Sequence, residues 1–115
     1  MTARDTQIKN MVVGLLQDIG TSIDNPDTEA AALLLSLAPA ESIRREMFQK
    51  LLLKYKHLID TKDDSLFEHL AKENANNPVV KDAVQKIRGN WSKLSPNMQK
   101  RVWATLSTGL RLISR

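Results

Sequence analysis

Three times along this chain a proline directly follows a residue that caps helices, at Asn25-Pro26, Asn77-Pro78 and Ser95-Pro96. The side-chain oxygen of Asn or Ser accepts a hydrogen bond from a free N–H at the start of a helix. Proline suits the next position because it lacks an N–H and its φ is already helical. A fourth proline, Pro39, cannot continue a helix that reaches it, so it separates two helical segments. The pattern predicts a chain built from helices.

Apolar residues recur at steps of three and four, the spacing that places them on one face of a helix. They predict six helices, at about 8–19, 26–38, 39–59, 66–70, 78 to 89 or 91, and 96–113. Gly20 is the predicted left-handed cap that ends the first helix. The second helix is apolar nearly all round, which predicts that the other helices surround it. The third is the longest amphipathic segment.

The chain has 115 residues, which fits one domain with a core of its own. It shows no solenoid repeat and no strand alternation, and the expected loops have the short lengths usual between neighbouring helices of a bundle. We therefore predict a single all-α domain over residues 1–115, folded as a compact bundle of five to six helices. Because the sequence has no cysteine, no signal peptide and no apolar run of about 20 residues, we expect an intracellular protein without membrane contact.

Charge divides the sequence into two unlike parts. Residues 1–42 carry two basic and six acidic side chains, whereas residues 43–115 carry 15 basic and seven acidic ones, so the net charges are −4 and +8. From Ala83 to Arg115 there are seven Lys or Arg residues and no Asp or Glu. Such polarity can steer a polyanion to one end of the molecule, or it can let two copies associate.

The residue patterns of catalytic and metal sites are missing from the sequence. His57 and His69 are its two histidines, and they do not have the spacing of zinc ligands. The acidic residues of 60–64 lack the glycine and the alternation of an EF-hand loop, and capping of the next helix accounts for them. No serine lies in a nucleophile elbow, and the glycines are scattered singly. We predict a non-enzymatic protein with no catalytic residue, metal, cofactor or small-molecule substrate.

The basic final third suggests nucleic-acid binding as one hypothesis. Lys and Arg on one face would neutralise phosphates in a salt-sensitive way that does not depend on base sequence. The candidate contacts are Lys86, Arg88, Lys93, Lys100 and Arg101. These residues would also suit the solvated face of two ordinary helices, and the pattern alone leaves both interpretations open.

Two tryptophans lie in the same basic third. Trp91 continues the apolar stripe of Val84 and Ile87, and Trp103 lies one turn before Leu106. We therefore predict that Trp91, Trp103 and Leu106 belong to the structural core and hold the last two helices together. Under this prediction the two rings are buried and do not serve as stacking platforms for nucleobases.

Two segments of the second half resemble a known family. They are Lys56-His-Leu-Ile-Asp-Thr-Lys-Asp-Asp-Ser-Leu-Phe67 and Ile87-Arg-Gly-Asn-Trp-Ser-Lys-Leu-Ser-Pro-Asn-Met-Gln-Lys-Arg-Val-Trp103, followed by Leu106. This half of the chain resembles a family of small helical proteins encoded by nucleocytoplasmic large DNA viruses. The resemblance implies a viral protein that acts in the host cytoplasm or is packaged in the virion, and it implies no biochemical activity.

Two functions follow as hypotheses. The leading one is a protein-interaction protein of such a virus, which binds itself or another protein through its surface. The alternative is a basic accessory protein that binds nucleic acid through its final third. A continuous basic stripe would favour the alternative, whereas basic residues interleaved with Glu68, Glu73 and Asp82 would indicate ordinary solvated helices.

Overall fold

A computed structural model of the chain describes residues 3–24 and 26–114. These residues form an all-α bundle without any strand, which confirms the predicted fold class. In chain order the elements are α1 (Ala3–Ile23), α2 (Pro26–Leu37), α3 (Ala40–Ser42), the π-helical η1 (Ile43–Gln49), the 3₁₀-helical η2 (Leu52–Tyr55), α4 (Lys56–Asp60), α5 (Leu66–Glu73), α6 (Pro78–Gly89), the short 3₁₀-helical η3 (Trp91–Lys93) and α7 (Pro96–Ile113).

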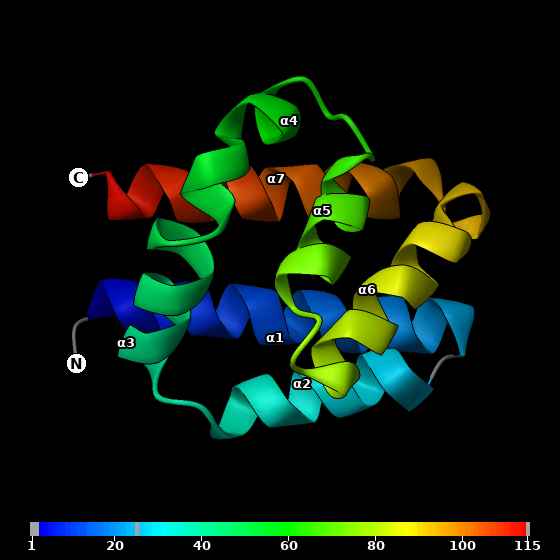
Figure 1. The fold of residues 1–115 in the computed structure, drawn as a ribbon, viewed down its shortest axis with the longest axis horizontal. Helices are drawn as coiled ribbons and strands as arrows, with labels where there is room; N and C mark the ends of the chain where they lie inside the picture. Colours follow the sequence, from blue (N-terminus) through cyan, green and yellow to red (C-terminus); the bar gives the residue numbers. More distant parts are fainter. Residues whose placement is uncertain (1–2, 25, 115) are drawn as a thin grey trace.

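α2, α1 and α7 form one layer of the bundle, and Figure 1 shows them stacked one above the other. α1 is in the middle and packs against both of its neighbours. η1, α5 and α6 cross in front of this layer, where η1 contacts α1 and α7, and α6 contacts α2 and α5 (Figure 1). Near the ends of the chain, Arg4 Nη1 donates to the carbonyl oxygen of Leu112 at 3.5 Å.

The core lies between the two layers. Ile8, Phe48, Leu52 and Leu66 are all completely buried, and they come from α1, η1, η2 and α5. The Phe48 ring lies against Gly109 of α7, so closely that a Cβ at position 109 would be 2.6 Å from the ring atom Cζ. The glycine therefore allows η1 and α7 to approach each other.

Two of the three predicted cap-and-proline starts are confirmed, and the Asn25 cap lies outside the described residues. Asn77 Oδ1 accepts a hydrogen bond from the Val80 N–H at 3.3 Å, and α6 begins at the next residue. Ser95 Oγ accepts from the Met98 N–H at 3.1 Å, and α7 begins in the same way.

The predicted cap at Gly20 is wrong. α1 continues to Ile23, Gly20 is buried within it, and no glycine in the described part of the chain has a positive φ. The left-handed residue is Asp24, with a φ of 49°. Ile23 packs against the core, so the helix gains apolar burial by extending beyond the glycine.

The left-handed conformation at Asp24 leads to a prediction about stability. Asp24→Gly should raise the free energy of unfolding by about 0.5 kcal/mol, because glycine adopts a positive φ without the steric cost of a Cβ. Urea unfolding measures the change. Lys62, with a φ of 54°, offers a matched position at which Lys62→Gly should act in the same direction. A loss of stability in both variants would contradict this account.

The predicted continuous helix over 39–59 is also wrong. The segment is divided into α3, η1, η2 and α4, with the Lys50 N–H donating to the Arg45 carbonyl at 3.0 Å across five residues. The buried residues Ile43 and Phe48 are five positions apart, which matches a π turn better than an α turn. The wider turn keeps both side chains facing the core, and α-helical spacing would not.

The prediction that the other helices surround α2 is wrong as well. α2 packs on α1 and α6 along one side, while Leu33, Leu34 and Leu37 on another side are exposed. The helix lies at the bottom of the bundle in Figure 1, with no described element beneath it. Its leucines therefore form part of the surface.

Candidate protein-interaction surface

An exposed row of apolar side chains runs along the outer face of α2. Leu33, Leu34 and Leu37 are 63%, 41% and 77% exposed, and Ala30 is also exposed. The four residues are spaced i, i+3, i+4 and i+7, so they share one face of the helix. We call them the α2 ridge. A single exposed leucine is ordinary, but contiguous ones are typical of contact surfaces.

Small residues on the inner face of α2 explain why the leucines are outside. Thr28, Ala31 and Ala32 are at most 2% exposed, and they face the body of the protein. Their short side chains let α2 lie close against α1 and α6, with which it makes its main contacts. The larger leucines at the next positions of the helix then point to solvent.

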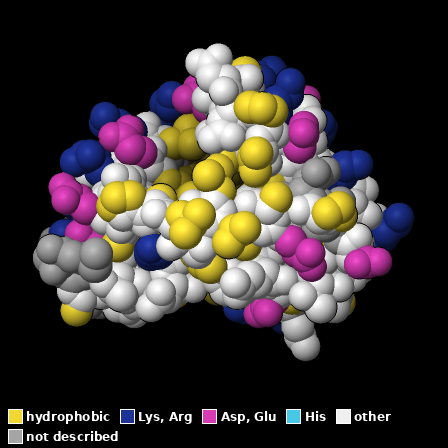
Figure 2. All heavy atoms as spheres, turned by 90° about the horizontal axis from the view of Figure 1, so that it is seen from below, with side chains coloured by type: hydrophobic (Ala, Val, Ile, Leu, Met, Phe, Trp, Pro, Cys, Tyr) yellow, Lys and Arg dark blue, Asp and Glu magenta, His cyan; other side chains and the backbone are white. Residues whose placement is uncertain are grey.

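A groove with a volume of about 270 Å³ lies beside the ridge. Its walls come from α1, α2, η1, η2, α5 and α6. Figure 2 shows hydrophobic side chains both inside a hollow and along the face next to it. The lining residues are Leu16, Ala31, Leu35, Met47, Leu51, Leu52, Leu70, Val80, Ala83, Val84 and Ile87, with the polar residues Glu46, Asn74 and Asn77. We call the ridge and the groove together the α2 face.

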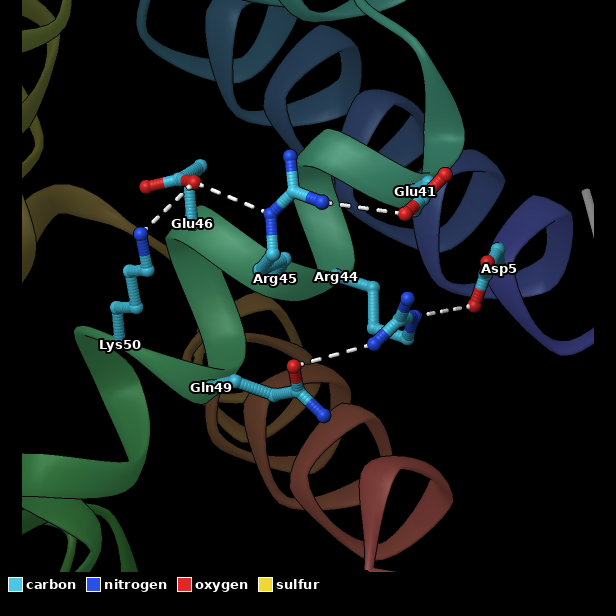
Figure 3. Close-up of polar contacts among 7 residues, drawn as sticks. All are labelled: Asp5, Glu41, Arg44, Arg45, Glu46, Gln49 and Lys50. Atoms are coloured by element: carbon cyan, nitrogen blue, oxygen red, sulfur yellow. Dashed lines mark hydrogen bonds and ion pairs between the residues drawn. The ribbon is translucent and has the colours of Figure 1, made fainter.

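The η1 wall of the groove carries a cluster of ion pairs around Glu46 (Figure 3). Glu46 Oε1 lies 3.2 Å from both Lys50 Nζ and Arg45 Nε, and Arg45 Nη1 lies 3.1 Å from Glu41 Oε1. Hydrogen bonds first from Lys50 and then from Arg45 lower the pKa of Glu46 below its ordinary value. The wall therefore presents a carboxylate held between two exposed cations.

A more buried ion pair attaches η1 to α1. Arg44 Nε lies 2.7 Å from Asp5 Oδ1, and the two side chains are 16% and 4% exposed (Figure 3). Arg44 Nη1 also donates to Gln49 Oε1 at 3.1 Å within η1. Charged groups with so little water around them are costly to separate, so the pair holds the η1 wall in place.

The five candidate nucleic-acid contacts are all exposed, and they extend from α6 through η3 to α7. Two of them are in ion pairs. Arg88 Nη2 lies 3.6 Å from Glu68 Oε1, and Arg101 bonds to Asp18 of α1. Lys86, Lys93 and Lys100 have no carboxylate within ion-pair distance among the described residues. Acidic side chains thus interrupt the basic surface.

The tryptophans and Leu106 lie where α5 meets the end of the chain. Trp103 and Leu106 are 5% and 6% exposed, while Trp91 is half-buried. The Phe67 ring of α5 lies 5.1 Å from Trp91 and 5.8 Å from Trp103 between ring centroids. The indoles contact each other at 5.5 Å in an edge-on arrangement. These rings pack against one another and are not free to stack on bases.

The histidines and the acidic loop take part in local structure. The His69 ring stacks on Tyr55 at 5.0 Å between centroids. Asp63 Oδ1 accepts a hydrogen bond from the Ser65 N–H at 3.0 Å just before α5, and this bond lowers the pKa of Asp63.

Within the described residues no group of three or more His, Cys, Asp or Glu could hold a metal ion. No helix described there combines the length and apolar character needed to cross a bilayer.

Sequence reasoning did not find the α2 face, because a helix apolar all round was expected to be buried. A usable signal was present in Ala31 and Ala32, which precede Leu33 and Leu34 and place small residues on the inner face. A second signal is the complete lack of Lys and Arg from residue 10 to residue 43.

Comparison of the chain with protein-family models, curated proteins and solved structures gives no match.

Proposed function

We propose that this chain is a non-enzymatic protein-interaction protein that binds through the α2 face. The exposure of Leu33, Leu34 and Leu37 beside an apolar groove carries the proposal. Burying such a row against a partner removes apolar surface from water, which is the main driving force of protein association. The resemblance of the second half to proteins of large DNA viruses supports an infected cell or a virion as the setting.

A second candidate function, nucleic-acid binding, has one observation in its favour. Lys86, Lys93 and Lys100 are exposed and form no ion pair with the described residues. If they contact phosphates, binding to labelled DNA should fall steeply as salt rises and should be lost when all three are changed to Ala. Binding that is insensitive to salt and to these substitutions would rule this candidate out.

Site-specific photo-crosslinking tests the proposed interaction surface. A photoreactive residue at position 37 replaces a leucine that is 77% exposed, and one at Ala104 on the exposed side of α7 serves as the matched control. In cells that naturally make the protein, position 37 should give protein adducts that position 104 does not give. Identical adduct patterns at the two positions would contradict the proposal.

A further inference from the structure

We infer that the partner of the α2 face is a helix of another protein, with an apolar side that is flanked by Lys or Arg residues. The inference rests on the proposed function and names the chemistry of the partner. The α2 ridge supplies apolar contacts along one side of α2, and the groove beside it supplies a hollow between helices. An amphipathic helix binds to a surface of this kind by laying its apolar side into the groove.

The shape of the α2 face fits a helix. The ridge extends from Ala30 to Leu37, which is about two turns or roughly 10 Å of helix. A helix that lies beside α2 can place apolar side chains three and four positions apart against the ridge and into the groove. The described residues form no strand, so this face has no sheet edge to which an extended peptide could add.

Charge along α2 determines which helix fits. Glu29 is exposed one turn before Leu33, on the same side of α2 as the ridge. Within the described part of the chain its carboxylate forms neither an ion pair nor a hydrogen bond. Asp24, just before α2, is also exposed and has no ion-pair partner among those residues. Because residues 10–43 contain no Lys or Arg, the charged groups that α2 offers to a partner are carboxylates.

The negative charge is confined to the start of α2. On the right of Figure 2, the end at which α2 begins in Figure 1, acidic side chains adjoin the hydrophobic ones. On the η1 wall, by contrast, Glu46 already pairs with Arg45 and Lys50. Just beyond the last residue of α2, Lys9 Nζ donates to the carbonyl oxygen of Ala38 at 2.8 Å. The Lys or Arg residues of the partner therefore lie over the start of α2.

The net charge of the chain opposes this preference and so makes it diagnostic. The whole chain carries +4, and this charge alone would attract an acidic peptide more strongly than a basic one. At physiological ionic strength, charges separated by more than about 8 Å are largely screened. The carboxylates at the start of α2 then act on a helix that touches them, and the distant cations do not. A preference for a basic helix therefore indicates binding at the α2 face.

Fluorescence anisotropy with two labelled synthetic peptides tests the inference on the purified full-length chain. Each peptide is a helix of about 18 residues, because shorter helices are marginal in water. Both have the same leucine side, and their remaining positions are Lys in one peptide and Glu in the other. At physiological salt the Lys peptide should bind about tenfold more tightly than the Glu peptide.

Two pairs of variants connect this binding to the α2 face. Leu37→Ser on the ridge should weaken binding of the Lys peptide by about tenfold or more. Its control is Leu53→Ser, at a leucine that is 44% exposed and does not line the groove, and it should leave binding unchanged. Glu29→Lys should weaken binding of the Lys peptide several-fold and strengthen that of the Glu peptide. Asp82→Lys makes the same change of charge at an exposed position of α6 outside the groove, and it should leave the preference unchanged. Circular dichroism confirms that each variant is folded.

Three results would overturn the inference: binding of neither peptide up to millimolar protein, binding of the Glu peptide that is as tight as that of the Lys peptide or tighter, or Lys-peptide binding that survives both Leu37→Ser and Glu29→Lys. Crosslinking at position 37 separates this failure from failure of the proposed function. Specific adducts to an acidic segment, or to a second copy of this chain, would leave the α2 face an interaction surface and rule out a basic helix as its partner. If the peptides do not bind and position 37 gives no specific adduct, both proposals fail.

Discussion

Trp103→Ala is expected to lower the free energy of unfolding by about 3–5 kcal/mol, the range found for truncating a buried large aromatic side chain. Trp103 is 5% exposed, and its ring contacts Trp91 and Phe67. The substitution removes apolar burial and two aromatic contacts together, and it leaves a cavity where α7 meets α5. For a chain of this length the midpoint of thermal unfolding should fall by roughly 10–20 °C.

Thermal unfolding followed by circular dichroism measures this effect, and Trp91→Ala provides the comparison. Trp91 contacts the same phenylalanine but is half-buried, so its truncation should cost less. An unchanged midpoint for Trp103→Ala, or a larger drop for Trp91→Ala, would contradict the central place of Trp103 in this aromatic cluster.

Gly109→Ala is the second substitution with a large expected effect. A Cβ at position 109 would lie 2.6 Å from Cζ of Phe48 and closer still to Cε1. Phe48 is completely buried, so its ring has no open space to enter. Either α7 separates from η1 or the ring leaves its rotamer. We expect a loss of about 3 kcal/mol, at the upper end of the usual cost of overpacking a core.

Two other variants separate this clash from a general effect of alanine. Gly89 of α6 has no atom within 4 Å of the position that a Cβ would occupy, so Gly89→Ala should stabilise by up to about 1 kcal/mol. Phe48→Leu leaves room for a Cβ at position 109. In combination with Gly109→Ala it should therefore recover part of the stability that Gly109→Ala loses. Urea unfolding of the single and double variants measures the coupling. Strictly additive losses would show that Phe48 does not block position 109.

Features that depend on neighbours along the chain were predictable from the sequence. Asn77 and Ser95 each bond to an N–H three residues later, so their roles as caps are contained in a short segment. Gly20 shows the limit of this reasoning, because packing of Ile23 against the core carries α1 past the glycine. The π turn of η1 was not predictable, since it depends on the space that Gly109 leaves for Phe48.

The candidate site was less predictable than the fold, because it depends on contacts between distant residues. The pairing of Arg101 with Asp18 joins residues 83 positions apart, and it removes one of the five expected phosphate contacts. The ridge leucines are exposed because small residues elsewhere on α2 face α1 and α6. Composition identified α2 as apolar, but only the packing of the bundle determines which of its sides faces water.

The packing of α1 against α7 also affects how the protein can fold during synthesis. Pro96 comes 73 residues after Ile23, so α1 leaves the ribosome roughly 4–15 s before α7 begins to emerge, at the usual rates of translation. During that interval the side of α1 that α7 will cover has no native partner. The hydrogen bond from Arg4 to Leu112 can form only after residue 112 has been synthesised. Native folding is therefore completed after translation of α7, and the nascent chain exposes apolar surface of the kind that chaperones bind.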